Sequence, residues 1–335
     1  MPAVNVLIHP SQFPDAVRRD LLESLRTRRI NHKFHYESVK QTSKWLALHN
    51  AHSPARTEPD CAAAYDRVFA ETARRLAADP VHVVGLGCGG GQKDTRLLQS
   101  LRARGKRVRY TPVDVGVPMV LTACQEASKV VSAGECQPIV CDLLMATDLD
   151  QLLDRLPESN WPRIVTFFGM IPNFEPQAIF PRLANLVRAG DHVLFSANLA
   201  PGADYAAGVQ TVLPQYDNEL TRDWLLTFLL DLGVHQDDGQ ISVWVEDCPD
   251  PLPLKRIVAE YRFSKARSLS VDGETFAFQA GEEIRLFFSY RYQPAQVRAL
   301  LADAGFETIE ESLAASREEG IFLCRKAVTT GGCYL

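Results

Sequence analysis

Val81-His-Val-Val-Gly85-Leu-Gly87-Cys-Gly89-Gly90-Gly91-Gln-Lys93-Asp94-Thr-Arg96-Leu-Leu98 is the stretch of sequence that decides the fold. Its first residues are apolar and β-branched, as in a buried strand, and its last residues are typical of a helix. The glycines between them, including Gly87 and Gly89, let the backbone turn sharply and approach a ligand without a Cβ clash. The stretch therefore predicts a strand, a tight turn and a helix, with a ligand at the turn.

Two acidic residues follow this turn where a bound nucleoside needs them. Asp114 ends a second strand-like run, and Asp142 ends a third, with Leu143 directly after it. A carboxylate at the end of the next strand can accept hydrogen bonds from both ribose hydroxyls. A carboxylate at the end of the third strand can accept one from an exocyclic amine. Lys93 opens the helix after the turn, where it can meet the carboxylate of a methionine tail. This layout is typical of an S-adenosylmethionine (SAM) site.

A dinucleotide site is the alternative, because Gly85, Gly87 and Gly90 also satisfy the G-x-G-x-x-G pattern. Such a site would make the protein an oxidoreductase and would rest a pyrophosphate on backbone N–H groups at the helix N-terminus. A turn that binds nothing is a further alternative. SAM is favoured because the dinucleotide pattern requires neither Lys93 nor Asp142. The expected product is S-adenosylhomocysteine (SAH), and no metal is expected, since the sequence has no H-E-x-x-H or C-x-x-C motif.

Strand-like and helix-like runs alternate between residues 81 and 197. Strands are expected at 81–85, 108–114, 137–141, 163–168 and 192–197, and helices at 93–104, 116–132, 148–155 and 176–188. This alternation implies a parallel sheet covered on both faces, with ligands at the carboxyl ends of its strands. A final helix at 293–304 and strands at 306–311 and 321–325 resemble the end of class I methyltransferases. The expected fold class is α/β, a Rossmann-like doubly wound sheet of that type.

The remaining segments have a different rhythm. Helical spacing is found at 14–29, 59–78 and 205–232, short helices and loops are expected over 31–58, and residues 241–285 alternate as strands do. The last of these predicts an inserted antiparallel layer. The tail, 329–335, is expected to be disordered.

Composition narrows the class of protein. The 335 residues suggest one large domain or two ordinary ones, and 46% hydrophobic with 23% charged residues is typical of a globular protein. A net charge of −5 argues against a nucleic-acid partner, so a small-molecule substrate is expected. We expect no membrane span and no signal peptide, and the scattered cysteines fit reduced thiols in the cytoplasm. Monomer and dimer both stay open.

Four stretches carry a family resemblance. They are Lys33–Tyr36 followed by Ser53–Glu58, Leu86–Gly89 with Lys93, Phe167–Phe174 with Gly169 and Asn173, and Ala280–Glu283 leading to Ser289. In them the chain resembles the SAM-dependent histidine Nα-methyltransferases of ergothioneine biosynthesis. That broad family also includes fungal N-methyltransferases acting on prenylated tryptophan. The likeness extends from about residue 10 to residue 327.

The resemblance implies two domains. Residues 59–197 and 287–328 would bind SAM, while residues 1–58 and 198–286 would form a second α+β domain that binds the substrate and closes over the cofactor. It also implies that Asn173 binds the amino end of an amino-acid substrate, with Tyr36 nearby. The residues expected to bind SAM are Gly87, Gly89, Lys93, Asp114, Asp142 and Leu143.

Departures from the family concern the substrate. Where the family has a histidine-reading glutamate, two residues before Ser289, this chain has Phe287. An imidazole N–H facing Phe287 would lose a hydrogen bond, which costs about 1–3 kcal/mol. Val243 replaces a methionine, and His52 or Ser53 replaces a substrate-lining tyrosine. We therefore expect an amine with an apolar or aromatic side chain in place of L-histidine.

Methyl transfer from a sulfonium mainly requires that the nucleophile be positioned. A free α-amino group has a pKa of about 8, which burial would lower, so no strong general base is required. Asn173 and Tyr36 are expected to hold the amine, Gly169 to leave room for it near the methyl group, and Arg56 is a candidate for binding a carboxylate.

Each candidate residue also has a purely structural interpretation. Asn173 could be a turn residue or helix cap, Tyr36 a core residue, His52 a surface histidine, Ser289 a strand residue, Arg56 a partner of Glu58, Asp114 a solvent-facing strand end and Lys93 a surface lysine. The functional alternatives are O-methylation of a small acid or phenol, and a SAM-binding protein without catalysis.

Overall fold

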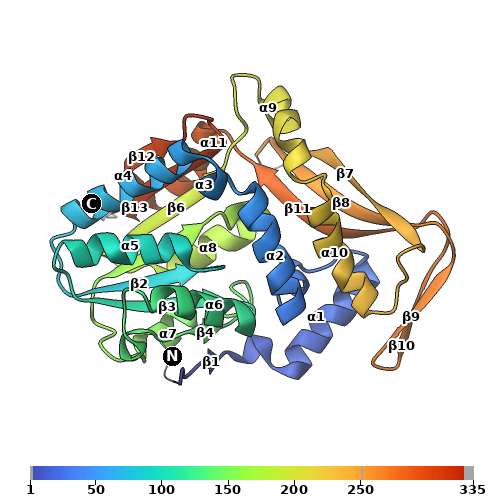
Figure 1. Ribbon diagram of the computed structural model, residues 1–335, viewed down its shortest axis with the longest axis horizontal. Helices are drawn as coiled ribbons and strands as arrows, with labels where there is room; N and C mark the ends of the chain where they lie inside the picture. Colours follow the sequence, from blue (N-terminus) through green and yellow to red (C-terminus); the bar gives the residue numbers. More distant parts are fainter. Residues whose placement is uncertain (1–2, 250–251, 328–335) are drawn as a thin grey trace, which may run out of the picture.

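The computed structural model describes residues 3–249 and 252–327, and its centre is an eight-stranded sheet (Figure 1). In sheet order the strands are β1 (Leu7–Ile8), β4 (Ile139–Val140), β3 (Val108–Asp114), β2 (Val81–Leu86), β5 (Arg163–Phe168), β6 (His192–Asn198), β13 (Glu319–Lys326) and β12 (Phe306–Leu313). Neighbours from β1 to β6 pair in parallel, and β13 lies antiparallel between β6 and β12. The predicted parallel sheet and closing hairpin are confirmed.

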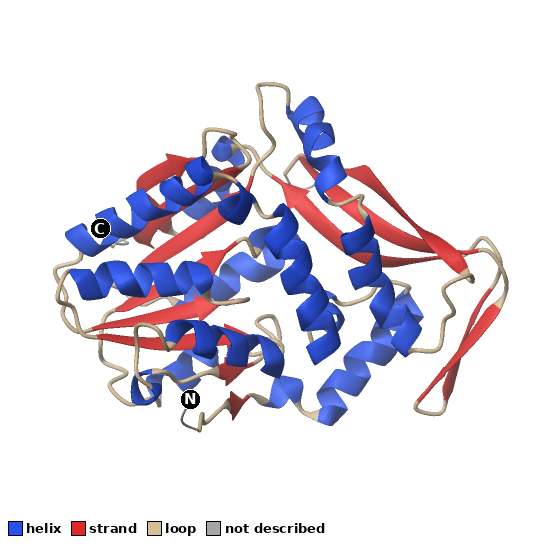
Figure 2. Ribbon diagram, in the orientation of Figure 1, coloured by secondary structure: helices blue, strands red, loops and turns tan. Residues whose placement is uncertain are grey.

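Helices cover both faces of this sheet (Figure 2). One face packs against α4 (Pro59–Arg75), α5 (Gln92–Ala103) and α6 (Val117–Ala127), and the other against α7 (Leu149–Asp154), α8 (Pro176–Leu186) and α11 (Pro294–Asp303). All six residues of β2 are buried, as cover on both faces requires. The strand order reverses around β2, which is where ligands bind in sheets of this kind.

The turn after β2 has the predicted conformation. Gly87, Gly89 and Gly91 have φ angles of 61°, 51° and 76°, in the left-handed region that side chains disfavour. A Cβ on Gly87 would lie 2.4 Å from the Met170 sulfur, and a Cβ on Gly89 would lie 3.0 Å from the Trp45 ring. Glycine is therefore needed here both for the turn and for the close approach of two other segments.

A second sheet lies beside the first and has three antiparallel strands in the order β11 (Glu283–Arg291), β8 (Leu254–Phe263) and β7 (Gly239–Cys248). A hairpin of β9 (Arg267–Val271) and β10 (Glu274–Phe278) extends from it. Five further helices are α1 (Pro14–Thr27), α2 (Val39–His52), α3 (Pro54–Thr57), α9 (Tyr205–Val212) and α10 (Glu219–Asp231). Short 3-10 helices are η1 (Pro10–Gln12), η2 (His32–His35), η3 (Ala133–Glu135), η4 (Ile171–Asn173) and η5 (Leu213–Gln215). The predicted inserted antiparallel layer is confirmed.

A buried apolar cluster joins α1 and α10 to the three-stranded sheet, while α2 packs on α10 (Figure 1). The N-terminal helices and the insertion thus share one core, because amphipathic helices must bury their apolar stripe. The division into two domains with the expected boundaries stays a prediction. β11 pairs with β8 from Glu283 to Arg291, so the strand crosses the boundary expected at residue 287.

Some expected elements differ from the structure. The single helix expected over 205–232 is wrong: Pro214 interrupts it within η5, and Asn218 caps a new helix by accepting from the Thr221 N–H at 3.0 Å. The strand expected over 137–141 is limited to Ile139–Val140, and no pattern in the sequence predicted β1. The tail 329–335 lies outside the described residues. Among the described helices, none has the length and apolar character that crossing a bilayer demands.

Candidate functional site

A cavity of about 560 Å³ lies at the carboxyl ends of the central strands, next to β11 and α10. Thirteen of the fourteen predicted site residues line it: Tyr36, His52, Arg56, Gly87, Gly89, Lys93, Asp114, Asp142, Leu143, Gly169, Asn173, Phe287 and Ser289. The exception is Val243, which pairs with Ala259 within the sheet and packs partly buried against its apolar clusters. Residues from widely separated parts of the chain thus meet in one place.

Asp114 is buried at the end of β3, directly beside the glycine turn. Its Oδ2 accepts from the Gly89 N–H at 3.1 Å, and its Oδ1 accepts from the Val115 N–H at 2.8 Å. Burial raises the pKa of this carboxyl to about 6, while the backbone N–H groups oppose that shift. The alternative of a solvent-facing strand end is wrong.

Asp142 follows β4 and connects it to the N-terminal segment. Its backbone N–H donates to the Ser11 hydroxyl at 3.0 Å, and its Oδ1 accepts from the Leu144 N–H at 2.9 Å. Its Oδ2 lies 3.6 Å from the Lys33 ammonium, which also pairs with Asp20. Only the tertiary structure shows that the Lys33 ammonium lies beside Asp142, because Lys33 comes from a segment more than 100 residues away.

Lys93 forms an ion pair that the sequence did not indicate. Its Nζ donates to the Tyr65 hydroxyl at 2.6 Å and to Glu319 Oε1 at 3.0 Å, and Tyr65 also hydrogen-bonds to Glu319. Burial opposes ionisation of Glu319, but the Lys93 charge and these hydrogen bonds hold its carboxyl pKa below the usual value. Lys93 is therefore not an ordinary surface lysine, since its ammonium is anchored at the cavity wall.

The loop after β5 carries Gly169 and Asn173. Gly169 has a φ of 67°, and its N–H donates to the Ser196 hydroxyl at 2.9 Å. Asn173 ends η4, while the cap of α8 is Glu175, so the cap alternative for Asn173 is wrong. Within the described residues, no protein group hydrogen-bonds to the Asn173 side chain. Asn173 lines the cavity, and with no such bond its amide oxygen and nitrogen are both available to a ligand.

Tyr36 is half-buried between two indoles, with ring centroids 5.9 Å from Trp45 and 5.5 Å from Trp224. Burial, reinforced by the negative charge of Asp114, raises the pKa of the Tyr36 phenol above its ordinary value. The phenol therefore stays protonated and can donate a hydrogen bond. Arg56 donates to Gln92 Oε1 at 2.6 Å and also bonds to Asn50, so the structural alternative of an ion pair with Glu58 is wrong.

One face of β11 contacts Tyr216, a residue that the sequence did not single out. Its hydroxyl lies 3.0 Å from the Ser289 hydroxyl and accepts from Arg291 Nη2 at 2.7 Å. Arg291 could have been found from the sequence, because strand side chains alternate and it is two residues beyond Ser289. Tyr216 gave no such signal, since it lies in an irregular segment between η5 and α10.

Phe287 lies on the same face of β11 and is enclosed by rings. Its centroid is 4.9 Å from His32 in a stacked arrangement and 5.7 Å from Trp224 in an edge arrangement. The His32 Nε2 accepts from the Phe288 N–H at 3.2 Å, and burial lowers the pKa of His32 to about 3, so this imidazole is neutral. This part of the cavity is therefore an aromatic, uncharged wall.

The donor set fits SAM. A turn with no Cβ, a buried carboxylate at the end of β3, a second at the end of β4 and an ammonium at the start of α5 border one cavity. Among the described residues, no group of three or more His, Cys, Asp or Glu side chains could hold a metal ion. The sheet order and this site together define a class I SAM-dependent methyltransferase.

Comparisons with known proteins agree with this class. The chain belongs to the family described as histidine-specific, SAM-dependent methyltransferases, whose model matches residues 17–326. It is 28% identical over 318 residues to the histidine N-alpha-methyltransferase of Mycobacterium tuberculosis, covering 88% of this chain and 90% of that protein. It is 27% identical over 315 residues to the enzyme of the same name from Mycolicibacterium smegmatis, covering 87% and 89%.

A solved structure of magnesium protoporphyrin IX methyltransferase from Synechocystis PCC 6803, with bound SAH, shows a weaker likeness. It has 13% identity and a TM-score of 0.44, and the match covers 87% of this chain and 97% of that chain. SAM dependence and methyltransferase activity, both expected from the sequence, are confirmed by the family.

Proposed function

We propose that this enzyme methylates the amino group of an amino acid, or of a small molecule derived from one, whose side chain is apolar or aromatic and is not that of L-histidine. The observation that carries the proposal is the position of Phe287, which is 6% exposed and stacked on the neutral His32 ring. An imidazole N–H placed against these rings would lose its hydrogen bond with water and gain none.

The amine end of the substrate is assigned to the loop after β5. Asn173 has a free side-chain amide there, and Gly169 has no Cβ, so an amine can approach closely. SAM, when bound, supplies an activated methyl group on a sulfonium. Asn173 Oδ1 can accept a hydrogen bond from the amine and orient its lone pair, and the protonated Tyr36 phenol shields the amine from water. No general base is needed, since an amine in this cavity loses its proton more readily than in water.

The carboxyl end of an amino acid has a candidate partner in Arg291. This guanidinium is 3% exposed and donates to Tyr216 at the cavity wall. A substrate carboxylate bonded to the Tyr216 hydroxyl would place a negative charge close to this cation. The cavity then offers an amine site, a cationic end and an aromatic wall, which match the three parts of such an amino acid.

The proposal is tested by incubating the protein with SAM carrying a labelled methyl group and a panel of acceptors. The panel should contain L-phenylalanine, L-tyrosine, L-tryptophan, their N-methyl and prenylated derivatives, L-histidine and small phenols. Mass spectrometry of the products locates the methyl group on nitrogen or on oxygen. We expect N-methylation of an aromatic or apolar member and poor turnover of L-histidine. Efficient L-histidine methylation, or a product methylated on oxygen, contradicts the proposal.

Asn173→Ala provides the second part of the test. With the best acceptor we expect kcat/KM to fall about 100-fold, because a misplaced nucleophile loses the advantage of orientation. SAH affinity should be unchanged, since the cofactor residues are not altered. Unchanged turnover by this variant contradicts the role of Asn173.

A further inference from the structure

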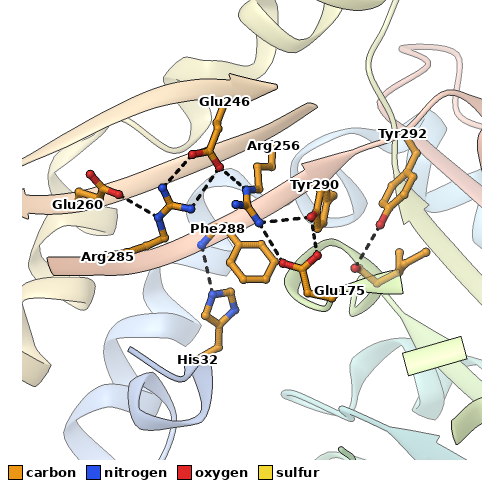
Figure 3. Close-up of polar contacts among 10 residues, drawn as sticks. His32, Glu175, Glu246, Arg256, Glu260, Arg285, Phe288, Tyr290 and Tyr292 are labelled. Atoms are coloured by element: carbon orange, nitrogen blue, oxygen red, sulfur yellow. Dashed lines mark hydrogen bonds and ion pairs between the residues drawn. The ribbon is translucent and has the colours of Figure 1, made fainter. Parts of the chain in front are cut away.

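A chain of alternating charges runs across the three-stranded sheet and ends on the loop that carries Asn173 (Figure 3). Arg285 bonds to Glu260 at 2.9 Å and to Glu246 at 2.9 Å, and Glu246 bonds to Arg256 at 2.6 Å. Arg256 Nη1 then donates to Glu175 Oε1 at 3.0 Å. Glu175 is the last member, and it is two residues after Asn173.

A second contact holds the other oxygen of the same carboxylate. The Tyr290 hydroxyl donates to Glu175 Oε2 at 2.7 Å, and Arg256 Nη1 lies 3.3 Å from that hydroxyl. Tyr290 is buried, and its burial together with the Glu175 carboxylate raises the pKa of the phenol above its usual range. The phenol therefore stays a donor, and both oxygens of Glu175 are held from strands β8 and β11 (Figure 3).

The start of the same loop is held by the next tyrosine on that face of β11. The Tyr292 hydroxyl lies 3.5 Å from the Ile171 carbonyl oxygen, at the outer limit of a hydrogen bond. Tyr290 and Tyr292 are two residues apart and point to one side of the strand, whereas Phe287, Ser289 and Arg291 face Tyr216 on the other. One strand therefore lines the substrate side of the cavity and also holds the loop that carries Asn173.

These contacts add little to the stability of the fold. The Glu175 side chain is 50% exposed, and an ion pair with that exposure is weak. Glu175 is the cap residue of α8, but its side chain makes no capping hydrogen bond. The contacts instead fix the position of the Glu175 side chain, because two donors from a different sheet define where its carboxylate and backbone lie.

We propose that Glu175 is a positioning residue: gripped by Arg256 and Tyr290, it sets the place of Asn173 relative to the substrate wall of β11. This inference rests on the proposed function, in which Asn173 holds the amine. Substrate recognition by β11 and amine placement by the loop are then coupled through one carboxylate. Loss of its contacts with Arg256 or Tyr290 would misplace the nucleophile without preventing cofactor binding.

The test uses two ligands that require no methyl acceptor, SAH and sinefungin. Sinefungin has an amine where SAM carries its methyl sulfonium, whereas SAH has no group there. If Asn173 binds an amine beside the transferred methyl, it will bind the sinefungin amine. The ratio of the two Kd values, measured by calorimetry on the full-length protein, reports the placement of the loop. A change that is merely structural would weaken both ligands and leave the ratio unchanged.

We expect wild-type protein to prefer sinefungin by about 10-fold, the value of one well-placed hydrogen bond. Asn173→Ala should bring the ratio close to one. Glu175→Gln and Tyr290→Phe should each lower it by about 3-fold or more, with the Kd of SAH changed less than about 2-fold. Glu260→Gln is the matched control: it breaks a member of the same chain of charges that does not touch the loop, and the ratio should stay at the wild-type value.

The two proposals fail in different ways. The first possible result is that Asn173→Ala abolishes the preference for sinefungin over SAH, while Glu175→Gln and Tyr290→Phe leave it intact. That result overturns only the positioning role of Glu175. Equal weakening of SAH and sinefungin by the Glu175 and Tyr290 variants also overturns it. A wild-type ratio near one overturns both proposals, because no amine-binding group then lies beside the methyl.

Discussion

Arg291 donates a hydrogen bond from Nη2 to the Tyr216 hydroxyl over 2.7 Å, and this guanidinium is a buried cation without a buried anion beside it. Within the described residues its guanidinium contacts the Leu199 carbonyl and the Tyr216 hydroxyl but no carboxylate at ion-pair distance, and its Nε has no hydrogen-bond partner. A buried charge is costly unless it is paired. An anionic ligand at this end of the cavity would supply the missing partner.

Arg291→Met should therefore separate substrate binding from stability. With an amino-acid acceptor we expect kcat/KM to fall about 10-fold or more, because a charge-assisted contact is lost. With the corresponding amine that lacks a carboxylate the loss should be small. Thermal stability should not fall, since replacing a buried charge by an apolar side chain of similar volume is often neutral. Equal losses for both acceptors would contradict a carboxylate-binding end, and Arg298→Met, an exposed arginine, is the control.

Variants of Lys93 and Glu319 should affect folding stability and SAM affinity differently. Lys93→Met leaves the buried Glu319 carboxylate without its cation and should cost about 3 kcal/mol of unfolding free energy. Adding Glu319→Gln should restore much of that stability without restoring SAM affinity. Decarboxylated SAM should bind both variants nearly as well as it binds the wild type, because it lacks the group that Lys93 is expected to hold. Denaturation and calorimetry measure the two effects, and a double variant that recovers SAM binding would refute the assignment.

Asp114 predicts that cofactor affinity depends on pH. Its carboxyl pKa is about 6 because it is buried, and only the ionised form can accept from both ribose hydroxyls. The Kd of SAH should therefore rise as pH falls through 6 and be constant above about 7. Asp94, also buried with a pKa raised to about 6, could add to this slope. Asp114→Asn is the control: its SAH affinity should be lower at pH 8 and lose most of its dependence on pH.

The effect of Asp114 ionisation on folding stability has the opposite sign to that of most carboxylates, whose ionised form stabilises the fold. Because the folded-state pKa of Asp114 lies above its unfolded value, the folded protein binds more protons between pH 4 and 6. Ionisation of Asp114 thus destabilises the ligand-free fold fully above pH 6, and this cost disappears as pH falls below about 4. Asp114→Asn should accordingly raise the ligand-free Tm at pH 8, measured by calorimetry.

Phe287→Glu should shift specificity toward L-histidine. A carboxylate at this position can accept from an imidazole N–H, and we expect kcat/KM for L-histidine to rise about 10-fold or more. The same change should weaken turnover of aromatic acceptors, because a charge replaces a ring beside His32 and Trp224. Phe287→Leu, which changes shape without adding charge, should not improve L-histidine turnover. A Glu variant that resembles the Leu variant would show that other residues exclude histidine.

The local parts of the site could be predicted from the sequence. Gly87 and Gly89, the aspartates that end β3 and follow β4, and Lys93 each belong to one strand-turn-helix unit, where chain order fixes the neighbours. Residues whose role depends on contact between two distant segments could not be predicted from the sequence. Glu319 meets Lys93 because β13 inserts between β6 and β12, and no pattern near either residue records that.

Val243 shows the opposite failure. Its place in the sequence, next to Trp244, indicated a substrate contact, but the direction of a side chain in a sheet depends on pairing and twist. Paired with Ala259, it packs within the sheet instead of lining the cavity. A family position therefore predicted the strand correctly and the side chain's surroundings incorrectly.

By itself the sequence determined the α/β sheet, the cofactor turn and the class of enzyme, because alternating hydrophobic runs and glycine turns act within a few residues. The tertiary structure alone decided which distant side chains share the cavity: Tyr216 with Ser289 and Arg291, Lys33 with Asp142, and Glu175 with Arg256 and Tyr290. These pairs arise when two sheets and the N-terminal helices pack together, and packing of that kind depends on shape and burial over the whole chain.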